Sequence, residues 1–170
     1  MNRALIYVSL VLLVFVSPIA VSEQAAFTDF NGNTQSISHY SGNGKWLVVM
    51  LWASDCTVCN REAHNYQDFY QSHLAKKDAS VLGISLDGVK GKKAAQAFID
   101  RHNIKFPNLL GDAASIVEMY QTLTGSDWVG TPSFMVYTPD GKLLGAQAGA
   151  VPVEVIESFI KREDATAEKS

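Results

Sequence analysis

The pattern of apolar and polar positions divides most of the chain into alternating strands and helices. Residues 45–52, KWLVVMLW, form a continuous apolar run rich in β-formers, which is typical of a strand covered on both faces. Residues 57–75 are polar-rich, with apolar or aromatic side chains at close to helical spacing. The same reasoning predicts a buried strand at 81–86 and helices at 92–102 and 113–123, the last with Asp112 as its N-cap. Such alternation predicts a mostly parallel sheet with helices on its faces.

The two ends of this region have hairpin patterns instead. Residues 26–40 alternate apolar and polar positions around an Asn-Gly-Asn turn at 31–33, which predicts a short hairpin. Residues 133–138 and 143–147 flank a Pro-Asp-Gly-Lys turn, which predicts a second, antiparallel hairpin. A helix at 153–162 is expected to follow, and then a polar, flexible tail at 163–170.

Composition and charge narrow the class of protein. A chain of 170 residues with 47% hydrophobic content suits a single domain with a sizeable core, expected here at residues 26–162. The formal net charge is −3 and the sequence has no Lys/Arg block, which argues against nucleic acid as a partner. No Gly-rich phosphate loop follows a strand, so no cofactor is expected.

The first 22 residues have the plan of a secretory signal peptide. Arg3 precedes an uncharged apolar stretch at 4–16, and Pro18 and small residues follow, with cleavage expected after Ser22. The alternative is an uncleaved membrane anchor, because the apolar segment is nearly long enough to span a bilayer. In either case we expect an exported, periplasmic protein, in a compartment where disulfides persist.

Cys56 and Cys59 are the two cysteines of the chain and lie at the start of the predicted helix that follows the strand at 45–52. A cysteine in the first turn of a helix is stabilised as thiolate, which lowers its pKa from about 8.5 to between ~3.5 and ~7.5. Cys56 is therefore expected to attack a substrate disulfide. Cys59, one turn on, is placed to resolve the mixed disulfide that results.

Three other uses of the pair fit less well. A zinc site normally needs four ligands, and the four histidines are scattered without a second cysteine pair. A purely structural disulfide across so short a loop removes little entropy from the unfolded chain. A one-cysteine peroxidase of the peroxiredoxin kind would carry a Pro-x3-Thr-x2-Cys signature, which precedes neither cysteine. Reversible thiol-disulfide exchange is therefore the interpretation that the sequence favours.

Several motifs together resemble one branch of the thioredoxin superfamily. The features are Trp52-Ala53-x-x-Cys56-x-x-Cys59, Glu62, Gly130-Thr131-Pro132 and the Asn-Gly hairpin ahead of the first long strand. Over residues 26–162 they resemble TlpA/ResA-like proteins. The resemblance implies an α/β thioredoxin fold of three α/β/α layers around a mixed sheet, with an added N-terminal β-hairpin and a central strand-helix insertion. It also implies an exported thiol-disulfide oxidoreductase, usually a reductase supplied with electrons by a membrane thiol transporter.

The resemblance further assigns roles around the cysteines. Pro132 corresponds to the family's cis-proline, and the backbone of Thr131 is then free to pair with an extended substrate; the alternative is a trans proline that opens a strand. Glu62 corresponds to a glutamate that accepts a proton as Cys59 becomes nucleophilic; the alternative is a solvated acid near a helix N-terminus. Trp128 either forms part of the substrate-docking surface or packs half-buried.

Several positions depart from the family pattern, and three of them bear most on the site. Met50 stands where thioredoxin itself has a buried acid. That proton route is therefore missing, which favours Glu62 as the proton carrier. Asp55 replaces a common tryptophan beside the attacking cysteine, where it is expected mainly to cap the helix, although its charge opposes thiolate formation. Ser133 follows the proline where cytochrome-c-maturation members typically have glutamate, which weakens a cytochrome-specific assignment.

The sequence as a whole predicts an exported reductase of protein disulfides. A thiol oxidase or isomerase of the same fold is an open alternative, because direction depends on the relative stability of the dithiol and disulfide forms. A binding protein that holds Cu(I) between the two thiolates is the alternative from another class. The chain lacks the Cys-x3-Cys spacing that copper-delivering relatives of this fold use.

Overall fold

The computed structural model describes residues 26–167 and residue 169. The expected signal peptide or anchor at 1–22 lies outside the described residues. Within the described part of the chain, no helix combines the length and the apolar character needed to span a membrane.

Seven strands form one mixed sheet in the order β2-β1-β5-β4-β3-β6-β7. The strands are β1 (Phe27–Asp29), β2 (Thr34–Gln35), β3 (Trp46–Trp52), β4 (Ala79–Ser85), β5 (Asn108–Leu110), β6 (Ser133–Tyr137) and β7 (Leu143–Ala148). The central strand β3 pairs in parallel with β4 and antiparallel with β6. Both predicted hairpins are present, as the antiparallel pairs β1–β2 and β6–β7.

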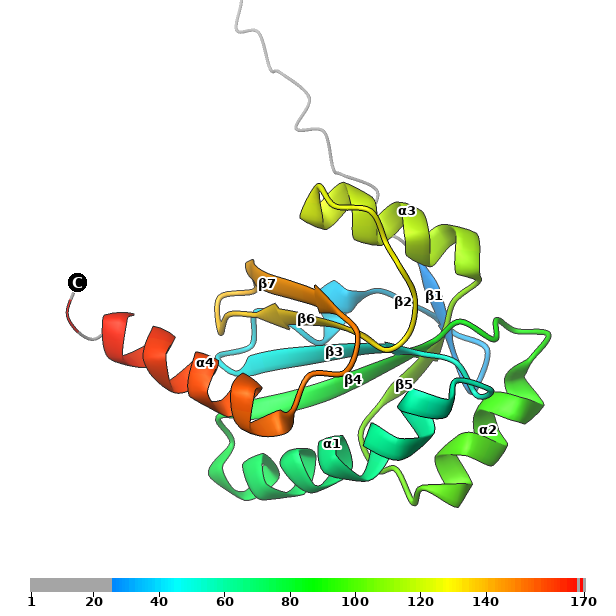
Figure 1. Cartoon of the computed structure of the whole chain (residues 1–170), viewed down its shortest axis with the longest axis horizontal. Coiled ribbons are helices and arrows are strands. Elements are labelled where there is room, and N and C mark those ends of the chain that lie inside the picture. Colours follow the sequence, from blue (N-terminus) through cyan, green and yellow to red (C-terminus); the bar gives the residue numbers. More distant parts are fainter. Residues whose placement is uncertain (1–25, 168, 170) are drawn as a thin grey trace, which may run out of the picture.

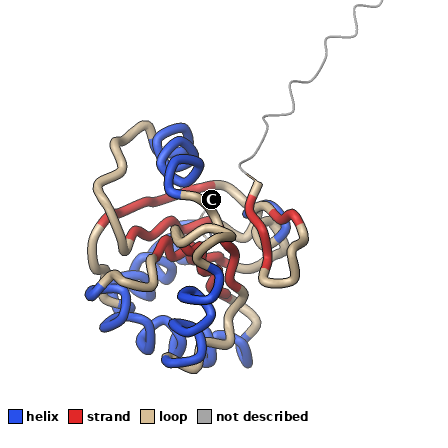
Figure 2. The backbone as a smooth tube through the Cα atoms, turned by 90° about the vertical axis from the view of Figure 1, so that its right-hand side faces the viewer, coloured by secondary structure: helices blue, strands red, loops and turns tan. Residues whose placement is uncertain are grey.

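Helices cover both faces of the sheet. They are α1 (Thr57–Lys76), α2 (Lys92–Arg101), α3 (Ala113–Thr124) and α4 (Val153–Ala167), with a 3-10 helix η1 (Ile37–His39) after the first hairpin. Helices α1, α2 and α4 lie on one face and α3 lies on the other (Figure 1), and the strands run between the two helical layers in the turned view of Figure 2. The predicted three-layer α/β/α arrangement is therefore confirmed.

The central strand explains why the sheet needs both layers. Every residue of β3 is buried, and successive side chains of a strand point to opposite faces. Trp46, Val48, Met50 and Trp52 enter the core shared with α1, α2 and α4, whereas Leu47, Val49 and Leu51 enter the core beneath α3. A continuous apolar run is thus the sequence signature of a strand with no solvated face.

The predicted N-cap of α3 is confirmed, whereas the predicted end of α4 is wrong. Asp112 is the N-cap of α3, as predicted, and its carboxylate accepts a hydrogen bond from Ser115 N at 3.0 Å. Helix α4, predicted to end at Arg162, continues to Ala167. Trp46 Nε1 donates to Asp164 Oδ1 at 2.9 Å, which attaches the last turns of this helix to the sheet. The sequence gives no local signal for such a long-range contact.

Trp52, the last residue of β3, is fixed on two sides just ahead of the cysteines. Its ring stacks on Phe98 of α2 with centroids 4.2 Å apart, and its Nε1 donates to Asn108 Oδ1 at 3.1 Å. Gly83 of β4 leaves the space for this hydrogen bond. A Cβ at Gly83 would lie 2.8 Å from Trp52 Nε1 and closer still to the Asn108 amide oxygen.

Replacing Gly83 with alanine is therefore expected to destabilise the fold. The added methyl group must displace Trp52 or Asn108, and overpacking of this kind costs about 1–3 kcal/mol of unfolding free energy. Urea unfolding measures the loss. Gly145→Ala on β7 is the control, because its Cβ would meet Phe159 only at an ordinary 3.5 Å, and a change within about 0.5 kcal/mol is expected there. Equal stabilities for the two variants would contradict the packing argument.

Candidate redox site

The sheet topology brings three distant segments to one edge. β3 and β4 are parallel, so the residues that follow Trp52 and those that follow Ser85 leave the sheet on the same side. β6 is antiparallel to β3, and Ser133 pairs with Leu51, so the residues just before β6 arrive at that same side. The carboxyl ends of parallel strands are a common place for functional sites in α/β proteins. The two cysteines lie here.

Cys56 and Cys59 form a disulfide, with Cα atoms 5.2 Å apart. Cys56 is itself the N-cap of α1, and its Sγ accepts a hydrogen bond from Cys59 N at 3.0 Å. The sulfur thus takes the place that a Ser, Thr, Asp or Asn oxygen usually fills at a helix start. Cys56 is partly exposed, whereas Cys59 is completely buried. The first cysteine is therefore accessible to a partner, and the second lies inside.

The expectation that Asp55 caps the helix is wrong. Cys56 N donates to Ala53 O at 3.2 Å, so the chain makes a turn over residues 53–56 and the first free helical N–H groups face Cys56 instead. Asp55 is exposed. Its carboxylate is left in solvent beside the redox pair.

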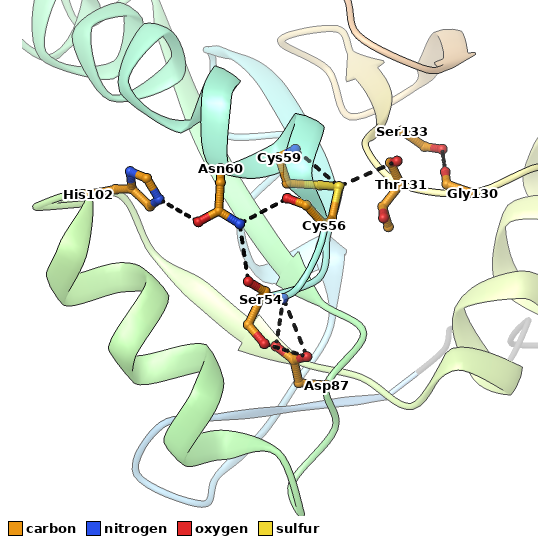
Figure 3. The surroundings of a disulfide bond; sticks show 9 residues. All are labelled: Ser54, Cys56, Cys59, Asn60, Asp87, His102, Gly130, Thr131 and Ser133. Atoms are coloured by element: carbon orange, nitrogen blue, oxygen red, sulfur yellow. Dashed lines mark hydrogen bonds between the residues drawn. A yellow bond between two sulfur atoms is a disulfide. The ribbon is translucent and has the colours of Figure 1, made fainter.

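The segment before β6 closes on Cys56 from the other side. The Thr131-Pro132 peptide bond is cis, and the Thr131 carbonyl oxygen lies 3.5 Å from Cys56 Sγ. Ser133 Oγ donates to Gly130 O at 2.6 Å, which bridges the ends of this turn (Figure 3). The structure thus brings together the two cysteines and the Thr131-Pro132 pair that the resemblance singled out.

Asp87, in the loop after β4, holds the chain ahead of the cysteines. Its Oδ2 accepts from Ser54 N at 3.2 Å, and its Oδ1 accepts from Ser54 Oγ at 3.0 Å (Figure 3). Ser85 Oγ also donates to Asp87 Oδ2, at 2.7 Å. The Asp87 carboxylate therefore fixes the loop between β3 and α1 through these hydrogen bonds.

Asn60 holds the same loop from the helix side. Its Nδ2 donates to Ser54 O at 3.1 Å and to Cys56 O at 2.9 Å. Sequence reasoning singled out neither Asn60 nor Asp87. The only signal available for Asn60 was its place next to Cys59, since its partners are backbone carbonyls that carry no residue code.

The side-chain hydrogen bonds of Glu62 go to Arg61 and Asn65, and neither cysteine is among its partners. Its side chain is 15% exposed and lies 3.2 Å from Arg61 Nε, and it accepts a hydrogen bond from Asn65 Nδ2 at 3.0 Å. Burial raises the pKa of Tyr66, and the negative charge of Glu62 raises it further. Tyr66 therefore stays a neutral phenol, which donates to Val151 O at 2.7 Å.

Met50 and Trp128 both belong to the packed interior. Met50 is buried in the core beneath α1, where it offers no proton route to the cysteines. Trp128 is half-buried and packs against the core beneath α3. The ring of Trp128 therefore packs half-buried, as one of the two expectations had it. A docking role for Trp128 stays a prediction.

The sequence comparison places the chain in a family. A family model described as the AhpC/TSA family matches residues 21–145, a range that includes both cysteines. The chain belongs to the AhpC/TSA family.

Two curated relatives are thiol-disulfide oxidoreductases by name. The thiol-disulfide oxidoreductase ResA of Bacillus thuringiensis subsp. konkukian (strain 97-27) is 23% identical over 135 residues, which cover 79% of this chain and 72% of that protein. The sporulation thiol-disulfide oxidoreductase A of Bacillus subtilis (strain 168) is 19% identical over 116 residues, which cover 68% of this chain and 67% of that protein. The predicted resemblance to TlpA/ResA-like proteins is confirmed.

Solved structures share the fold. StoA from Bacillus subtilis superposes with a TM-score of 0.60 at 17% identity, covering 79% of this chain and 94% of that one. A thiol:disulfide interchange protein of the thioredoxin family from Chlorobium tepidum TLS superposes with a TM-score of 0.65 at 16% identity, covering 82% and 93%. The predicted thioredoxin fold is confirmed by these neighbours.

Proposed function

We propose that this chain is a protein thiol-disulfide oxidoreductase whose Cys56 and Cys59 cycle between dithiol and disulfide. One observation carries the proposal: the sulfur of Cys56 caps α1 and accepts the Cys59 N–H, while Cys59 is buried directly behind it. A cap of this kind stabilises a thiolate, and the thiolate is the nucleophile in disulfide exchange. The family and the named relatives support the same chemistry.

In the reducing direction the two cysteines supply both electrons, Cys59 supplies one proton and solvent supplies the other. The Cys56 thiolate attacks one sulfur of a substrate disulfide, whose S–S bond breaks and whose other sulfur leaves as a thiolate and takes up a proton. Cys59 then loses its proton and attacks Cys56 Sγ, so the mixed disulfide breaks and the second substrate thiol is released. Two electrons and two protons pass to the substrate, and the Cys56–Cys59 disulfide remains.

Thr131 and Pro132 are proposed to present the substrate. The Thr131 carbonyl lies beside Cys56 Sγ, so an extended segment that pairs with this backbone would carry its disulfide toward the attacking sulfur. Trp128, four residues ahead of Pro132 in the chain, supports the same segment by packing into the core beneath α3. A direct contact of Trp128 with substrate is not needed for this role.

We further propose that the protein is exported and acts as a reductase in the periplasm. The expected signal peptide supports export, and a membrane thiol transporter is then the proposed electron donor. If the leader is not cleaved, the same domain faces the periplasm from a membrane anchor. Holding Cu(I) between the two thiolates is the competing function, because soft sulfur ligands favour that ion.

Serine substitutions test the division of labour between the two sulfurs. Cys56→Ser is expected to abolish the reduction of insulin disulfides, because the attacking sulfur is gone. Cys59→Ser is expected to leave the first attack intact and to accumulate a mixed disulfide, which non-reducing gels and mass spectrometry detect. Ser72→Ala, at the far end of α1, is the control and should turn over normally. Tight stoichiometric Cu(I) binding without turnover by the unmodified protein would point to the binding protein instead.

Glu62→Gln tests the proposed proton carrier while it keeps the shape of the side chain. General-base catalysis contributes about 100-fold or more, so turnover in the insulin assay should fall by that order. The alkylation rate of Cys56 in the reduced protein should stay unchanged, because Glu62 is proposed to act on Cys59. A variant with normal turnover would make Glu62 a solvated acid paired with Arg61 and Asn65.

The reduction potential of the Cys56–Cys59 couple tests direction. A reductase should poise near the value of thioredoxin, about −270 mV, whereas a strong oxidant lies near about −120 mV. Equilibration of the purified protein with glutathione buffers, followed by thiol trapping, measures the potential. A value at the oxidising end would replace the reductase with a thiol oxidase of the same fold.

A further inference from the structure

The side-chain amide of Asn60 uses all of its hydrogen-bonding capacity. Both hydrogens of its Nδ2 are donated to the loop carbonyls of Ser54 and Cys56. Its Oδ1 accepts from His102 Nε2 at 2.9 Å (Figure 3). The same oxygen accepts from Arg101 Nη1 at 2.8 Å. An amide has two donor hydrogens and two acceptor lone pairs, so nothing is left over. Asn60 is the junction between the end of α2 and the redox loop.

The hydrogen bonds of Asn60 fix which of its neighbours donate to its side-chain oxygen. Because Asn60 Nδ2 faces two carbonyls, its Oδ1 must accept, and His102 must then carry its proton on Nε2. Burial lowers the pKa of His102, and the neighbouring Arg101 and His64 lower it further, which favours the neutral ring, whose Nε2–H still donates. Arg101 adds a full positive charge to the same oxygen. That cation draws electron density away from the Nδ2 hydrogens and strengthens their bonds to the loop.

We propose that Asn60 is a positioning residue through which Arg101 and His102, at the end of α2, set the ionisation of Cys56 and hence its redox balance. The inference rests on the proposed thiol-disulfide exchange. The side-chain hydrogen bonds of Asn60 go to Ser54, Cys56 O, Arg101 and His102, and none goes to a sulfur. It acts by fixing the carbonyls of Ser54 and Cys56.

Two physical effects give the expected sign. When the loop is fixed, Cys56 Sγ stays in line with Cys59 N–H, whose hydrogen bond stabilises the thiolate. The Arg101 charge, relayed through the amide, adds to this stabilisation and opposes the solvated carboxylate of Asp55. Loss of either contribution should raise the Cys56 pKa and favour the disulfide.

The test measures Cys56 itself in variants of this junction. In the reduced full-length protein, Asn60→Ala and Arg101→Gln should each slow iodoacetamide alkylation of Cys56 at pH 7. The expected factor is about threefold to tenfold, which is the range one hydrogen bond is worth. The pH profile of alkylation should move to higher pH, and the equilibrium with glutathione should shift by a similar factor toward the disulfide.

Matched controls separate this effect from general destabilisation. Asn43→Ala removes an exposed amide that donates to the Tyr40 carbonyl far from the cysteines, and Arg162→Gln removes a surface charge paired with Glu163. Both should leave alkylation and the glutathione equilibrium unchanged. Thermal unfolding of each variant completes the set, because a merely structural Asn60 would lower the melting temperature without moving the pH profile.

The double variant decides whether Arg101 acts through Asn60. If it does, Arg101→Gln should have no further effect on alkylation in the Asn60→Ala background, whereas independent contributions would multiply. Normal alkylation in both single variants would overturn the inference while leaving the exchange reaction in place. An unmodified protein with an ordinary Cys56 pKa and no turnover would instead overturn the proposed function.

Discussion

The structure depends on one hydrogen bond, from Cys59 N to the sulfur of Cys56. The first N–H groups of a helix need a partner outside the helix, and an oxygen of Ser, Thr or Asp usually serves. Here the partner is a sulfur that must also break and form bonds. The interaction that caps the start of α1 is therefore the same interaction that stabilises a thiolate, so the stability of this helix start and the reactivity of the nucleophile cannot be varied separately.

Everything around this hydrogen bond keeps the sulfur in place. The contacts come from segments far apart in the chain: Asp87 binds Ser54 across 33 residues, and Thr131 reaches Cys56 across 75. The sheet makes these meetings possible, because β3 and β4 run parallel and β6 runs back beside β3. The order of strands thus decides which loops share an edge, and the side chains of those loops then decide the local geometry.

Elements with a local sequence signal could be predicted, whereas contacts created by the sheet topology could not. The buried strand β3, the helix after it, both hairpins and the Asp112 cap were predicted because each has a local signal: an apolar run, a helical period, a turn residue or a capping residue. Asn60, Asp87 and His102 were missed because their partners are distant in sequence or are backbone atoms. Asp55 was misassigned for a related reason. A carboxylate just ahead of a helix is a good cap by composition, but Cys56 takes the N-cap position after the turn over residues 53–56.

The Cys-x-x-Cys motif alone specifies only part of the behaviour of the site. The motif and the fold define the class of chemistry, since they put one sulfur at a helix N-terminus and the other behind it. The balance between dithiol and disulfide depends on charges outside the motif. Asp87 is engaged by hydrogen bonds from two serines, Asp55 is solvated, and Arg101 reaches the loop through Asn60. Two chains with the same motif can therefore differ in redox balance when their second helix ends in different residues, because that end supplies the cation that donates to Asn60.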